Sequence, residues 1–132
     1  MPRIIRTEIQ KRFSDIDSFR HVNNVAQQMY FDVGKSDFFD RLLGREILFA
    51  PVRIITAATD TSYMGQIRLD DRIEVTTEIE RIGTKSLTLL QRIVSVDGEV
   101  RSQSRSVMVA FDFGAQQSVP IPDAWRKAFE KE

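Results

Sequence analysis

The residues best suited to chemistry stand in one short segment, residues 12–24. It holds two aspartates, the second of which is Asp17, and the one histidine of the chain, His21. Apolar residues at helical spacing follow directly, so the segment ends at a helix N-terminus. A carboxylate can serve as nucleophile or general base, and the unpaired N–H groups of a first helical turn can stabilise an oxygen that becomes negative. The segment therefore predicts attack on a carbonyl group placed at Asn23 or Asn24.

The same segment resembles the signature of hot-dog thioesterases, in which an Asp-x-Asp run, a few loop residues and a His-Val-Asn-Asn sequence open the central helix. Here these are Asp15-Ile16-Asp17 and His21-Val22-Asn23-Asn24. The likeness spans the 4-hydroxybenzoyl-CoA thioesterase type and the plant acyl-ACP thioesterases. It implies an α+β hot-dog fold, a five-stranded antiparallel sheet wrapped round a long central helix, and hydrolysis of an acyl thioester to the free acid and CoA.

The resemblance also assigns roles within the segment. Asp17 matches the catalytic aspartate, which attacks the carbonyl or activates a water, and the backbone N–H of Asn24 matches the oxyanion hole. The alternative for Asp17 is a turn or helix-capping role, and we expect Asp15 to be a structural turn former. His21 either packs beside the helix or assists catalysis, as the matching histidine does in the plant branch. That branch carries an asparagine where this chain has Phe19, which favours the acyl-CoA branch.

Further contacts with the substrate are expected from aromatic residues and from a basic turn. By resemblance, the residues around the Gly83-Thr84 turn hold the CoA nucleotide of a neighbouring subunit. The alternatives are a solvated hairpin end for the turn and plain core packing for the aromatics. The substrate-binding candidates are Asn23, Tyr30, Tyr63, Arg81, Thr84 and Lys85.

The elements that must position these residues follow from hydrophobic periodicity. Alternation predicts strands, and apolar residues at helical spacing predict helices. The long helix contains Gly34, where we expect a kink or close packing, and ends before Gly44, which suits a C-terminal cap. Asp97-Gly98 predicts a two-residue hairpin. The expected elements are strands over 3–13, 52–63, 72–80, 86–96 and 100–113, a helix over 22–43 and a short helix through 124–129.

Size and composition predict one soluble domain over residues 1–132. Lysine plus arginine equals aspartate plus glutamate at 19 each, so we expect no nucleic-acid partner and no anionic membrane partner. The absence of cysteine excludes disulfides, a thiolate nucleophile and Cys-ligated metals. With one histidine, no Gly-x-Ser-x-Gly elbow and no phosphate-binding loop, we expect neither a metal site nor a cofactor.

Location and assembly follow from the same considerations. No apolar run is long enough to span a bilayer, so we expect a cytoplasmic protein. A single small sheet leaves exposed edge strands, which predicts a homodimer or homotetramer. The competing hypotheses are a non-catalytic hot-dog protein that binds an acyl thioester and an acyl-ACP thioesterase.

Overall fold

The computed structural model describes residues 3–130. The strands and helices follow one another in the expected order, with one short strand and two 3-10 helices in addition. In chain order they are β1 (Ile5–Glu8), η1 (Phe13–Asp15), α1 (Asn24–Leu43), η2 (Arg45–Phe49), β2 (Val52–Tyr63), β3 (Ile73–Ile82), β4 (Ser86–Ser95), β5 (Val100–Asp112), β6 (Gln117–Ser118) and α2 (Asp123–Glu130).

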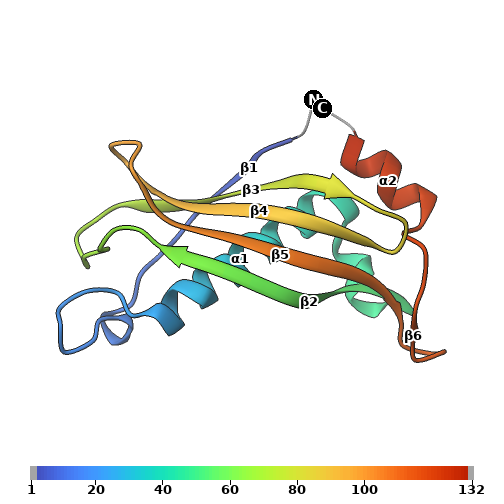
Figure 1. Cartoon of the computed structure of the whole chain (residues 1–132), viewed down its shortest axis with the longest axis horizontal. Helices are drawn as coiled ribbons and strands as arrows, with labels where there is room; N and C mark the ends of the chain where they lie inside the picture. The colour runs from blue at the N-terminus through green and yellow to red at the C-terminus, as the bar shows by residue number, and fades with distance from the viewer. Residues whose placement is uncertain (1–2, 131–132) are drawn as a thin grey trace.

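The strands form one antiparallel sheet in the order β1-β3-β4-β5-β2, and β6 adds a short pairing to β5. β3, β4 and β5 are consecutive neighbours and form a meander. α1 packs along one face of the sheet, where it contacts β1, β3 and β4 (Figure 1). This arrangement confirms the expected α+β hot-dog fold.

The first strand is shorter than its alternating sequence predicts. β1 ends at Glu8 because its partner β3 begins at Ile73, which leaves residues beyond Glu8 with little to pair against. Phe13, the last residue of the expected strand, instead opens η1 and is 83% exposed. The alternation continues past the last residue that the sheet can pair.

The loop of the β4–β5 hairpin is longer than expected. The predicted two-residue turn at Asp97-Gly98 is wrong in length, because residues 96–99 lie between the two strands. Gly98 adopts a φ of 87°, a conformation that favours glycine. The signal therefore marked the hairpin but not the length of its loop.

Both ends of α1 are closed by the chain itself. The side chain of Asn23 accepts a hydrogen bond of 2.7 Å from the Ala26 N–H, and Gly44 ends the helix with a φ of 83°. Gly34 lies against the sheet, where an added Cβ would approach Val75 Cγ1 to 2.6 Å. Close packing is therefore the reason for glycine at this position.

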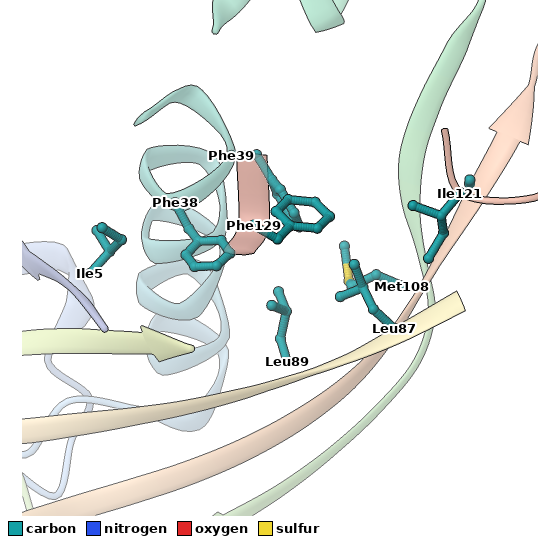
Figure 2. Close-up of a cluster of buried hydrophobic side chains, with 9 residues drawn as sticks. Ile5, Phe38, Phe39, Leu87, Leu89, Met108, Ile121 and Phe129 are labelled. Atoms are coloured by element: carbon teal, nitrogen blue, oxygen red, sulfur yellow. The ribbon is translucent and has the colours of Figure 1, made fainter. Parts of the chain in front are cut away.

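The core between α1 and the sheet consists of two hydrophobic clusters. The cluster near α2 contains Phe38, Phe39 and Phe129, whose rings lie close together in Figure 2. The cluster near the start of α1 contains Tyr30 and Phe31. Fully burying such side chains contributes roughly 2–3 kcal/mol each, so both clusters anchor the helix.

A polar row crosses the sheet between these clusters. Its members are cross-strand neighbours on the face toward α1, namely Thr61, Ser104, Gln91 and Thr77. Gln91 is fully buried and donates to the Phe31 carbonyl at 2.9 Å and to Thr77 Oγ1 at 3.0 Å. The hydroxyls of Thr61 and Ser104 lie 2.9 Å apart. The row joins helix to sheet by hydrogen bonds where the clusters do so by packing.

Within residues 3–130, an edge strand and a helix face offer surfaces on which a partner could bind. β2 pairs only with β5, so one side of this twelve-residue strand is free within residues 3–130. On α1, the apolar residues Val25, Met29 and Val33 are 68%, 50% and 50% exposed. None of the helices described is long and apolar enough to cross a membrane.

Candidate active site

The loop between β1 and α1 is a small hairpin that sets Asp17 opposite His21. Ile16 and Val22 form an isolated antiparallel bridge, and inside it the Asp17 N–H donates to the His21 carbonyl at 3.1 Å. Arg20 closes the turn by donating its N–H to the Asp17 carbonyl at 3.0 Å, with a φ of 68°. Only a few per cent of residues other than glycine adopt such a φ, so the tight turn is held by its surroundings.

Asp15 ties this hairpin to the rest of the molecule. Its buried carboxylate accepts hydrogen bonds from the Tyr30 hydroxyl at 2.6 Å and from Arg12, through the guanidinium at 2.9 Å and the backbone N–H at 3.0 Å. Its carbonyl accepts the Asn23 N–H at 3.0 Å. The loop is thus fixed both to the body of α1 and to its N-cap.

The same contacts shift two pKa values. Burial alone would raise the pKa of Asp15, but the hydrogen bonds from Tyr30 and Arg12 outweigh burial and hold that pKa below its usual range. Burial, together with the hydrogen bond to the Asp15 carboxylate, raises the pKa of Tyr30. Asp15 is therefore ionised and Tyr30 neutral across the physiological range.

The first turn of α1 leaves a backbone donor available beside this loop. Asn23, one of the expected substrate contacts, uses its side chain to cap the helix at Ala26. The N–H of Asn24 makes no hydrogen bond within residues 3–130. This donor lies at the positive end of the helix dipole, where negative charge is stabilised.

A pocket of about 320 Å³ brings the chemical groups together. Three of its residues, Asp17, His21 and Asn24, were the expected catalytic set, and Tyr63 was an expected substrate contact. The remaining lining residues are Phe19, Val22, Gln27, Met64, Gly65 and Gln66.

Within this pocket the two titratable groups differ in their partners. Asp17 is half-buried, and its Oδ1 accepts the Phe19 N–H at 2.9 Å. This is the turn contact expected of an aspartate in such a loop, and it occupies one carboxylate oxygen. The His21 ring makes no hydrogen bond to any residue of the described chain. Both side chains can therefore engage a bound molecule.

Other expected residues lie elsewhere. Tyr30 is 5% exposed and its hydroxyl is committed to Asp15, so it packs behind the loop. Arg81, Thr84 and Lys85 are exposed around the β3–β4 turn, which lies at the opposite end of the sheet from the β1–α1 loop (Figure 1). Arg126 of α2 holds this turn by donating to the Gly83 and Thr84 carbonyls at 2.5 and 3.1 Å. Within one chain, the basic turn and Asp17 do not meet.

Gln27 is the buried polar residue of this pocket that the sequence did not suggest. It is 3% exposed, and its amide pairs with Ser102 of β5 and with the Val22 carbonyl. A glutamine on a helix is usually exposed, and the local sequence does not show that this one has a buried partner on β5. No three histidine, aspartate or glutamate side chains of residues 3–130 lie close enough together to hold a metal ion.

Known proteins resemble this chain in sequence and in fold. A family model described as the thioesterase-like superfamily matches residues 12–129. A predicted thioesterase from Bacillus stearothermophilus is 31% identical, with a TM-score of 0.88 over 96% of this chain and 94% of that one. A thioesterase from Thermus thermophilus, solved with coenzyme A and Zn, is 23% identical, with a TM-score of 0.85 over 96% and 97% of the two chains. The long-chain acyl-CoA thioesterase FadM of Escherichia coli strain K12 is 23% identical over 96% of this chain and 98% of its own.

Proposed function

The chain belongs to the thioesterase-like superfamily and is a thioester hydrolase, and we propose that it hydrolyses an acyl-CoA at the pocket that contains Asp17. The observation that carries the proposal is the convergence of a half-buried carboxylate and an unbonded helical N–H on one pocket. Thioester hydrolysis needs these two groups, one to start the attack and one to stabilise the oxygen that becomes negative.

Asp17 starts the reaction as nucleophile or general base. As a base, its carboxylate takes a proton from a water whose oxygen bonds to the carbonyl carbon. The C–S bond then breaks, and the CoA thiolate receives the proton. As a nucleophile, the carboxylate forms a mixed anhydride with the acyl group and expels CoA, and water then hydrolyses the anhydride. Oδ2 is the oxygen suited to either step, because Oδ1 already accepts the Phe19 N–H.

The Asn24 N–H is the donor for the oxyanion. It stands at the first turn of α1, close to the loop that carries Asp17, and it has no competing acceptor in the described chain. Removing one such donor from an enzyme typically raises the barrier by about 3 kcal/mol.

His21 is the second titratable group of the site. Its ring lines the same pocket as Asp17 and makes no hydrogen bond to the described residues, so it is available to the substrate. In this scheme it assists near the sulfur or the attacking water, and His21→Asn tests that role by the loss of kcat.

Coenzyme A is the proposed carrier of the acyl group. FadM, which resembles this chain over nearly its whole length, acts on long-chain acyl-CoA, and this supports CoA over an acyl carrier protein. Phe19, where the plant acyl-ACP branch carries an asparagine, points the same way.

In this scheme the enzyme is a homodimer or homotetramer. The free side of β2 can pair with a second strand, and the exposed stripe of Val25, Met29 and Val33 offers a second contact. Arg81 and Lys85 are too far along the sheet to serve the Asp17 of their own chain. In the assembled enzyme, Arg81 and Lys85 of one subunit contact the CoA that is bound at the Asp17 pocket of a neighbouring subunit.

The experiment is a panel of short, long and aromatic acyl-CoAs, each assayed for released thiol, with one acyl-ACP included. Turnover of at least one acyl-CoA is the expected result. Turnover of acyl-ACP alone would favour the carrier-protein thioesterase. If acyl-CoA bound without turnover, the non-catalytic binder would replace the proposed enzyme.

A further inference from the structure

Gln27 is a buried glutamine that lies about one helical turn beyond Asn24 on α1. It lines the pocket with Asp17 and Asn24, although it is only 3% exposed. Residues three apart on a helix lie on the same side, so Gln27 and Asn24 are neighbours along α1. The Asn24 N–H and the Gln27 side chain thus lie beside the same pocket.

The partners of Gln27 determine which way its amide points. The Val22 carbonyl can only accept, so the amide nitrogen Nε2 faces it, at 3.4 Å. The amide oxygen Oε1 then faces Ser102, whose hydroxyl donates to it. Ser102 is fully buried on β5, so this orientation is held by the sheet.

One N–H of the amide is left over. Nε2 carries two hydrogens, and its only acceptor within residues 3–130 is the distant Val22 carbonyl. Oε1 is already engaged by Ser102. Gln27 can therefore offer the pocket a hydrogen bond through Nε2, while Oε1 is turned toward Ser102.

We infer that Gln27 is a catalytic residue that donates to the oxyanion together with the Asn24 N–H, and that Ser102 is its positioning residue. The inference rests on the proposed thioester hydrolysis. When the attacking oxygen bonds to the carbonyl carbon, the C=O electron pair moves onto oxygen, and the two donors stabilise that charge. When the C–S bond breaks, the electron pair on oxygen re-forms the C=O bond and the thiolate leaves with the electrons of the C–S bond. Both hydrogen bonds to the oxygen then weaken. A donor that strengthens only between these points raises kcat without tightening substrate binding.

The main test replaces Gln27 by methionine, which has a similar length but no N–H. Loss of an oxyanion donor lowers kcat by about 100- to 1,000-fold, and we expect KM to stay within about twofold. Gln27→Glu should be slower still, because a carboxylate repels the oxyanion. Gln103→Met on β5 is the matched control: Gln103 faces away from α1, pairs with Arg92, and should leave kcat unchanged.

Three further variants separate catalysis from folding. Gln27→Met leaves the buried Ser102 hydroxyl unpaired, so Gln27→Met/Ser102→Ala removes both partners and should recover the melting temperature without recovering kcat. Ser102→Ala alone should lower kcat by less than Gln27→Met, because the amide remains but is less firmly oriented. Ser102→Thr, which keeps the hydroxyl, should restore the rate.

The outcomes distinguish this inference from the function on which it rests. If the unmodified protein hydrolyses acyl-CoA but folded Gln27→Met keeps its kcat, Gln27 is not a donor and the thioesterase stands. A loss confined to KM would overturn the inference as well, since it indicates binding of the ground state. If the unmodified protein hydrolyses no acyl-CoA, both are wrong.

Discussion

The hydroxyl of Tyr30 donates a 2.6 Å hydrogen bond to Oδ2 of Asp15, and this bond joins the middle of α1 to the loop that carries Asp17. Asp15 and Asp17 are two residues apart, yet they face different surroundings. Asp15 is 2% exposed and its oxygens are taken by Tyr30 and Arg12, whereas Asp17 is half-buried at the pocket. One carboxylate holds the loop and leaves the other for chemistry.

Asp17→Asn should lower kcat by about 100-fold or more while the protein stays folded, because a neutral amide is neither nucleophile nor base. Steady-state kinetics and circular dichroism measure the two properties. Asp70→Asn, at an exposed aspartate, is the control. An Asp17→Asn enzyme with full activity would show that the assignment is wrong.

Asp15→Asn should act mainly on stability. It removes the charge that accepts from Arg12 and Tyr30 in a buried position, which we expect to lower the free energy of unfolding by about 2 kcal/mol. Urea unfolding measures this loss. If Asp15→Asn lowered kcat more than Asp17→Asn does and left stability unchanged, Asp15 would be the catalytic aspartate and Asp17 the structural one.

Tyr30→Phe should make the protein more sensitive to acid. Because the folded pKa of Asp15 lies below its unfolded value, its stabilising contribution is present above the unfolded pKa and is lost as the pH falls through the folded pKa. Removing the Tyr30 hydroxyl raises the folded pKa and shrinks that contribution. The midpoint of acid unfolding, followed by far-UV circular dichroism, should therefore move to higher pH, whereas Tyr63→Phe should leave it unchanged.

Arg81→Ala/Lys85→Ala should raise KM for acyl-CoA by about 10-fold and leave kcat in place, because the two cations would contact only the nucleotide phosphates. An acyl thioester of N-acetylcysteamine, which lacks the nucleotide, should show no difference. Lys127→Ala is the control for an exposed cation at the same end of the sheet. An equal effect on both substrates would assign the turn to structure.

Val33→Lys should reduce the assembly by at least one step, from tetramer to dimer or from dimer to monomer, because it places a charge in the exposed apolar stripe. Light scattering during size-exclusion chromatography measures the mass. Val96→Lys, at a residue 81% exposed on the β4–β5 loop, is the matched control. A fully active 15.2 kDa monomer would overturn both the assembly and the role of the basic turn.

The sequence predicted the elements better than it predicted which side chains are buried. Enrichment in β-branched residues predicted β2 with its observed bounds, and strict alternation located β3, because a half-buried strand leaves a period of two in its own residues. Helical spacing likewise located α1 but not its inner face. Val25 and Met29 are exposed, while Gln27 and Lys35 are buried.

The candidate site divides in the same way. Asp17, His21 and Asn24 are close in sequence, so a motif could place them together at the pocket. Gln27 owes its burial to Ser102, which lies 75 residues away along the chain. Partners at such separations leave no local pattern, and only the folded sheet shows that this glutamine is buried beside the pocket.

The polar row between the two hydrophobic clusters has a consequence for how this molecule could change over time. Packing around Phe38 and Phe129 is separated from the packing beneath the pocket by hydrogen-bonded side chains such as Gln91. Substitutions near α2 can therefore alter thermal tolerance while the geometry around Asp17 is preserved. Directed evolution could then select heat resistance at that end of the core and acyl preference at the other, with little epistasis between the two sets of mutations.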